Sequence, residues 1–187
     1  MFVAVMAGIW FTVLDVMSYT ATGSKILSPA GSPVGNALVV YDPGISGAAK
    51  NAALTIAGDL QSKGYTVDLA GVKSSTVGNV SGYNIIVAGG PTYGGVTSRS
   101  ITAFLKALTP PKTATVGVFA TGGFSFNNTI PWYEQDNITI SKEVSGIWND
   151  SSLNNTVAIR VIRGNESYRD CTDFVSKLLG QDGAKEI

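Results

Sequence analysis

The chain lacks histidine and contains a single cysteine, Cys171. Without histidine it has neither the commonest metal ligand nor the commonest general base, so metal-dependent and histidine-based hydrolysis are disfavoured. One cysteine also excludes an intrachain disulfide framework. The carboxylates of Asp136, Asp150 and Asp170 lie far apart in the sequence, with no spacing that would pair two of them on one face. The residue inventory therefore argues against an acid–base or metal centre.

Charge is also sparse. Only 14% of the residues are charged, and 13 basic residues balance 13 acidic ones. There is no basic footprint for nucleic acid, so we expect no nucleic-acid partner. With 187 residues, 44% of them hydrophobic, the chain can bury one good core and has little left for a second domain. One domain with an appendage is predicted.

The appendage is the apolar N-terminal stretch, residues 1–17, interrupted only by Thr12 and Asp15. About 20 residues span a bilayer, so we predict a membrane anchor at residues 1–19 and a membrane location, with the side of the membrane left open. A cleaved signal sequence and an amphipathic helix packed on the domain are the alternatives. Residues 20–36 are rich in Gly, Ser, Thr and Pro, which predicts a flexible linker before a globular domain at residues 37–187.

Within this domain, a strand, a tight loop and a helix follow one another. Residues 37–41 are apolar, residues 42–47 are rich in turn formers, and apolar residues then recur at helical spacing as far as Leu60. In such a unit, backbone N–H groups and the positive end of the helix dipole converge on any anion at the loop. The loop is therefore a candidate phosphate site, although an ordinary turn has the same pattern.

The alternation continues to the end of the chain. Further strands are predicted at residues 65–69, 83–88, 115–120 and 157–162, and further helices at residues 97–108, 137–148 and 167–179. This order predicts an α/β fold, a doubly wound five-stranded parallel sheet within a three-layer sandwich.

Three glycine-rich loops follow the first, third and fourth of these strands, at residues 42–49, 89–95 and 121–124. In an open parallel sheet, ligands bind outside the carboxyl ends of the strands, and glycine lets the backbone approach them closely. Tyr93, between a proline and a glycine pair, is suited to stacking on a planar ring. The three loops together favour a flat, phosphorylated ligand.

Residues 37–179 resemble a flavodoxin-like domain. The resemblance is carried by Val39-Val40-Tyr41 leading into residues 44–50, by residues 85–95, and by residues 118–123. It implies the cofactor FMN, with a phosphate loop after the first strand and two flavin-clasping loops after the third and fourth. The positions that match these loops are Gly44, Ile45, Ser46, Gly47, Ala48, Ala49, Pro91, Thr92, Tyr93, Gly94, Gly95, Thr121, Gly122 and Gly123.

The chain departs from the family pattern in two respects. The family's phosphate loop carries several hydroxyl residues, whereas here only Ser46 remains, with Ala48 and Ala49 where hydroxyls could stand. Family electron carriers are typically acidic, whereas this chain is neutral, so steering toward a basic redox partner is weak. We expect a membrane-tethered electron carrier that binds FMN, with an unidentified redox partner protein, more than a substrate-specific oxidoreductase. The alternatives are a module that has lost FMN and serves as a binding or structural domain at the membrane, and a flavin-dependent quinone reductase.

Two further features leave alternatives open. The segment at residues 124–136 carries four aromatic residues, and it could cover the flavin, recognise a partner or pin itself to the sheet edge. Six Asn-X-Ser/Thr sequons, against about two expected by chance, favour a domain outside the cell, whereas flavin electron carriers are usually cytoplasmic. The sequons begin at Asn79, Asn127, Asn137, Asn149, Asn154 and Asn165.

Overall fold

The structure is a computed structural model that describes residues 20–93, 96–122, 157–162 and 167–181. Its centre is a sheet with five parallel strands in the order β3-β2-β4-β6-β7. These strands are β2 (Gly35–Tyr41), β3 (Tyr65–Gly71), β4 (Ile85–Tyr93), β6 (Thr115–Thr121) and β7 (Val157–Ile162). The remaining elements are β1 (Ser24–Leu27), β5 (Val96–Thr97), α2 (Ala48–Ser62), α3 (Arg99–Ala107), α5 (Ser167–Leu178) and the 3₁₀ turn η1 (Ser75–Gly78).

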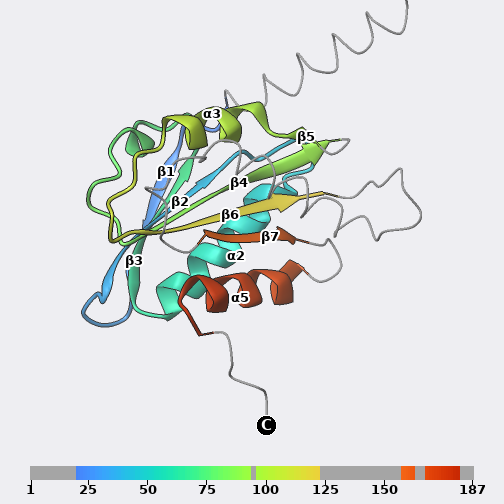
Figure 1. The fold of residues 1–187 in the computed structure, drawn as a ribbon. Coiled ribbons are helices and arrows are strands. Elements are labelled where there is room, and N and C mark those ends of the chain that lie inside the picture. Colours follow the sequence, from blue (N-terminus) through green and yellow to red (C-terminus); the bar gives the residue numbers. More distant parts are fainter. Residues whose placement is uncertain (1–19, 94–95, 123–156, 163–166, 182–187) are drawn as a thin grey trace, which may run out of the picture.

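Helices cover both faces of the sheet, as Figure 1 shows: α2 and α5 lie on one face, and α3 lies on the other. The predicted doubly wound α/β sandwich is therefore confirmed. The two helical layers follow from the parallel strands, because each crossover connection must return along the sheet on one face or the other.

The α2/α5 face has a closely packed core. Small residues on α2 bring the helix near the strands, and the rings of Phe119 and Phe174 pack edge to face with their centroids 6.5 Å apart. Gly117 on β6 makes room for α5, because a Cβ there would lie 2.7 Å from side-chain atoms of both Phe174 and Leu178. The residues that α2 buries are Ala49, Ala52, Ala53, Ile56, Ala57 and Leu60.

The predicted membrane location is corrected by the structure. Among the helices of the described residues, none combines the length and the apolar character that crossing a bilayer requires. Residues 1–19, in which the anchor was predicted, lie outside the described residues. The predicted helix at residues 137–148 and the aromatic segment at residues 124–136 also lie outside them.

Residues 20–36 differ from the flexible linker that their composition predicts, because they contain β1. This strand pairs antiparallel with β3, from Ser24 opposite Ala70 to Leu27 opposite Val67. Its first three residues are exposed, so the strand is held mainly by backbone hydrogen bonds at the sheet edge. Such pairing needs no apolar pattern, which is why the composition did not reveal it.

The strand β4 is longer than predicted. Thr92 and Tyr93, expected in a loop, continue the strand and pair antiparallel with Thr97 and Val96 of β5. The resulting β4–β5 hairpin leads directly into α3. The backbone of Tyr93 is thus held by sheet pairing.

Candidate functional site

The candidate site lies where the carboxyl ends of β2, β4 and β6 meet. Tyr41 at the end of β2 pairs with Gly89, and Pro91 near the end of β4 pairs with Thr121. Between β2 and β4 the strand order reverses, since β2 leads to α2 on one face and β4 leads to α3 on the other. This is the topological switch point at which ligands of open α/β sheets bind.

The first part of this site is the 42–49 loop, which includes the first two residues of α2. Gly44 and Gly47 have φ angles of 61° and 71°, in the left-handed region that favours glycine. Gly47 is the N-cap of the 15-residue helix α2, and no side chain caps that helix end. Ser46 instead accepts a bond from the N–H of Ala48 at 3.3 Å.

Several backbone amides of the 42–49 loop remain available to an anion. The N–H of Gly44 donates to Asp42 Oδ1 at 3.1 Å, and the N–H of Ile45 donates to Tyr93 Oη at 2.9 Å. Within the described residues, no hydrogen bond is donated by the backbone N–H groups of Ser46, Gly47, Ala49 and Lys50. Unpartnered amides at the start of a helix form an anion-binding concavity.

Hydrogen bonds to Asp42 connect the 42–49 loop to the start of α3. Its side chain is only 3% exposed, and its Oδ2 accepts bonds from the hydroxyls of Ser98 at 2.5 Å and Ser100 at 2.6 Å. Ser98 is also the N-cap of α3, where its Oγ accepts from the N–H of Ile101 at 3.4 Å. This cluster was not predicted from the sequence, although a serine before a helix is a recognisable capping signal. These bonds give Asp42 a structural role.

The end of β4 packs directly on the 42–49 loop. A Cβ added at Gly44 would lie 2.9 Å from both Pro91 Cγ and Tyr93 Oη. The hydroxyl of Thr92 turns toward the next strand and donates to the carbonyl of Thr121 at 3.1 Å. Consequently β2, β4 and β6 are joined by side-chain contacts as well as by strand pairing.

The structure therefore brings together most of the residues predicted for the site. Residues 44–49 and 91–93 lie in contact, and Thr121 and Gly122 follow at the end of β6, both partly buried. Ala49 differs from the rest because its side chain is buried in the α2/α5 core, whereas Ala48 is exposed. Gly94, Gly95 and Gly123 lie outside the described residues.

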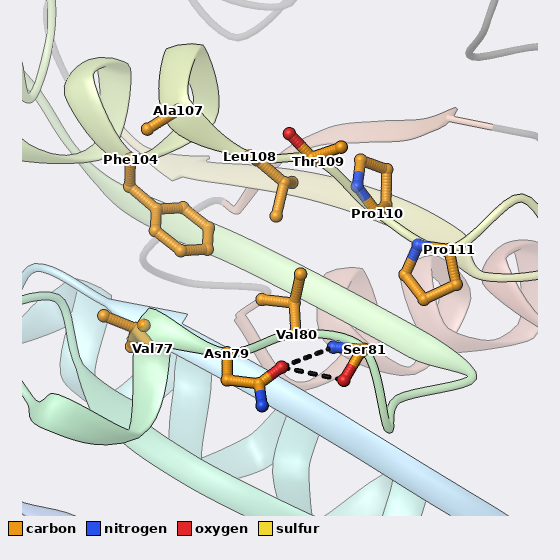
Figure 2. Close-up of a pocket in the computed structure, with 11 residues that line it drawn as sticks. Val77, Asn79, Val80, Ser81, Phe104, Ala107, Leu108, Thr109, Pro110 and Pro111 are labelled. Atoms are coloured by element: carbon orange, nitrogen blue, oxygen red, sulfur yellow. Dashed lines mark hydrogen bonds between the residues drawn. The ribbon is translucent and has the colours of Figure 1, made fainter.

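The amino ends of the strands, which we call the amino edge of the sheet, have different surroundings. A hollow of about 600 Å³ lies beside the amino ends of β4 and β6, and its walls are largely apolar and carry no charged side chain. In Figure 2, Phe104 and Leu108 lie opposite Val77 and Val80, and Asn79 accepts hydrogen bonds from Ser81 at the rim. This amino-edge hollow is lined by Val77, Gly78, Asn79, Val80, Ser81, Phe104, Ala107, Leu108, Thr109, Pro110 and Pro111.

The titratable groups of the core offer no nucleophile. Burial, with smaller contributions from Asp59 and Asp170, raises the pKa of the Cys171 thiol to about 12. Burial also raises the pKa of Tyr83, whose hydroxyl donates to Asp68 Oδ2 at 2.6 Å. The Cys171 side chain is also fully buried, and a buried thiol with a raised pKa is a poor nucleophile. In the described part of the chain, no group of acidic or cysteine side chains is arranged to hold a metal ion.

Comparison with known proteins extends these observations. No family model and no curated protein matches the chain. Among solved structures, a short-chain flavodoxin associated with a PDU bacterial microcompartment matches 78% of this chain and 97% of its own, with a TM-score of 0.57 and 14% identity. A Streptococcus pneumonia TIGR4 flavodoxin matches 78% of this chain and 98% of its own, with a TM-score of 0.55 and 16% identity.

A third similar structure is a larger enzyme. The rubredoxin:oxygen oxidoreductase of Desulfovibrio gigas matches 82% of this chain but only 38% of its own, with a TM-score of 0.51 and 14% identity. The same arrangement of strands and helices thus occurs both as a separate flavodoxin and as part of a longer protein. At these identities the likeness concerns the fold alone, and this chain has the flavodoxin-like fold.

Proposed function

We propose that this domain binds FMN at the carboxyl edge of its sheet and acts as an electron carrier. Flavodoxins are among the structures that it resembles, and the predicted phosphate loop lies at the switch point of the sheet. The observation that carries the proposal is the set of unpartnered amides at the start of α2.

These amides fit the phosphate of FMN. Four backbone N–H groups without partners among the described residues lie at residues 46, 47, 49 and 50, next to the positive end of a 15-residue helix. A phosphate dianion is stabilised there by charge-assisted hydrogen bonds and by the helix dipole, which adds up to about 1 kcal/mol. The exposed side chain of Ser46 supplies a hydroxyl on the same loop.

The residues of the chain hold and orient the cofactor, and they supply no acid or base. When bound, the isoalloxazine ring of FMN provides the redox chemistry. Asp42 keeps the 42–49 loop on α3, and Thr92 keeps the end of β4 on β6, so these two parts of the site are held in place before binding. A fixed site loses less entropy when its ligand binds.

The proposal also concerns how this chain recognises its electron donor and acceptor. The chain has no net charge, so we expect a redox partner to recognise its shape and local contacts more than a long-range field. The module without FMN is the less favoured alternative, because it gives no role to the unpartnered amides at α2.

Calorimetry of the full chain with FMN and with riboflavin tests the proposal. Riboflavin lacks the phosphate, so FMN is expected to bind at least tenfold more tightly. Anaerobic reduction of the FMN complex, followed by its reoxidation with a one-electron acceptor, tests the carrier role. The proposal fails if neither flavin binds at high micromolar concentration. The carrier role alone fails if the bound flavin is not reduced and reoxidised.

A further inference from the structure

The hydroxyl of Tyr93 lies on the 42–49 loop. It accepts the N–H of Ile45 at 2.9 Å, and a Cβ at Gly44 would lie 2.9 Å from the same oxygen. Tyr93 is held at both ends, because its backbone pairs with Val96 in the β4–β5 hairpin. The side chain therefore reaches from the end of β4 to the loop before α2.

The 42–49 loop itself is poor in hydroxyl groups. Ser46 is the only hydroxyl residue in its sequence, and the oxygen of Ser46 already accepts the N–H of Ala48. Ala48 and Ala49 have no polar side-chain atoms, and Ala49 faces the core. A hydrogen-bond donor from another element of the fold would therefore strengthen anion binding at this loop.

Tyr93 has such a donor. A phenol can accept one hydrogen bond and donate another. Its oxygen accepts from Ile45, while its own proton has no acceptor among the described residues. We propose that Tyr93 donates this proton to the phosphate of FMN and so supplies from β4 the hydroxyl that the 42–49 loop lacks. This inference rests on the proposed function of the site.

The assignment gives Tyr93 a role that differs from ring stacking. A stacking aromatic contacts the isoalloxazine ring, which FMN and riboflavin share, so its loss weakens both ligands equally. A phosphate donor contacts only FMN. The ratio of the two affinities therefore separates these roles.

Calorimetry of the unmodified chain, Tyr93→Phe and Tyr83→Phe with FMN and with riboflavin separates the two roles. Tyr93→Phe keeps the ring and removes the hydroxyl, which is both the donor assigned to the phosphate and the acceptor of the Ile45 N–H. The preference for FMN over riboflavin should therefore fall about tenfold, with riboflavin affinity unchanged. Tyr83→Phe is the matched control, since it removes a hydroxyl bonded to Asp68 near the amino end of β4. Its preference for FMN should equal that of the unmodified chain.

The other outcomes have different meanings. If Tyr93→Phe keeps the full preference for FMN, the inference is overturned while the proposed function stands. The same holds if both flavins weaken equally, because the hydroxyl then acts on a part of the site that both ligands share. If neither flavin binds the unmodified chain, the proposed function falls and the inference falls with it. Circular dichroism of both variants confirms that they are folded, and the amide resonance of Ile45 should shift in Tyr93→Phe alone.

Discussion

The end of β4 at the carboxyl edge and the surroundings of the amino-edge hollow differ in how closely their glycines are packed. At the carboxyl edge, a Cβ on Gly89 would lie 2.3 Å from the ring of Phe119, and one on Gly90 would lie 3.0–3.2 Å from three side chains. At the amino edge, Gly78 and Gly82 have nothing within 4 Å of such an atom. At the carboxyl edge the backbone of β4 therefore approaches its neighbours closely, whereas the glycines beside the amino-edge hollow lie in open space.

The hydrogen bonds around Asp42 and around the amino-edge hollow differ in how far apart in the sequence their partners lie. At the carboxyl edge, Asp42 joins two loops that are 56 residues apart in the chain, through its bond to Ser98. At the amino edge, the bonds around the hollow are local, such as those from Ser81 to Asn79 two residues away. The long-range bond between Asp42 and Ser98 is of the kind that holds a ligand site at the carboxyl edge in a fixed arrangement.

The largest effect is expected from Gly89→Ala. Its methyl group overlaps the ring of Phe119 in a packed core, so the free energy of unfolding should fall by about 2 to 3 kcal/mol. Gly78→Ala, in open space at the amino edge, should stay within about 0.5 kcal/mol of the unmodified chain. Urea denaturation measures both changes. Equal stabilities of the two variants would contradict the contrast between the edges.

Asp42→Asn is expected to cost about 2 kcal/mol. The substitution keeps the shape of the side chain but replaces charge-assisted bonds from Ser98 and Ser100 with weaker ones. Tyr83→Phe loses a single hydroxyl bond and should cost about 1 kcal/mol in the same denaturation experiment. A larger loss from Tyr83→Phe than from Asp42→Asn would show that the loop connection is not a main stabilising contact.

Ser46→Ala tests the phosphate loop without touching the core. The exposed side chain contributes one hydroxyl to the 42–49 loop, so the preference for FMN over riboflavin should fall by about 1 kcal/mol. Thr55→Ala, which removes an exposed hydroxyl farther along α2, should leave the preference unchanged. Calorimetry with both flavins gives the two values, and an unaltered preference in Ser46→Ala would remove its side chain from the site.

Ala48→Ser is the smallest change and should act in the opposite direction. Ala48 is exposed at the start of α2, so a hydroxyl there should strengthen FMN binding by about 0.5 kcal/mol. Ala49→Ser places its hydroxyl in the apolar α2/α5 core, so it should lower stability and give no gain in affinity. Titration of FMN fluorescence measures the affinities. The account of which alanine faces the ligand is contradicted if Ala49→Ser improves binding.

The fold could be predicted because its signals are local. The run at residues 157–162 coincides with β7, and the apolar spacing after Ala48 matches α2, since apolar strands and amphipathic helices leave distinct sequence patterns. The edge strand β1 left none, because it is held mainly by backbone pairing with β3 and only Leu27 packs against the core.

The candidate site could be predicted only in part. Glycines at Gly44 and Gly47 indicated a loop that the backbone can approach, and both adopt left-handed φ angles. The bonds from Ser98 to Asp42 and from Ile45 to Tyr93 could not be read from the sequence, because they join segments far apart in the chain. Such contacts depend on how the strands align, which no local pattern encodes.

A ¹⁵N–¹H correlation spectrum of the full chain, recorded as FMN is added, shows where on the domain the ligand binds. If FMN binds at the carboxyl edge, the amide signals of Ser46, Gly47 and Ala49 should shift most, because these N–H groups receive the phosphate. The signals of residues 77–81 at the amino-edge hollow should remain in place. Shifts confined to residues 77–81, or an unchanged spectrum at millimolar FMN, would contradict the account.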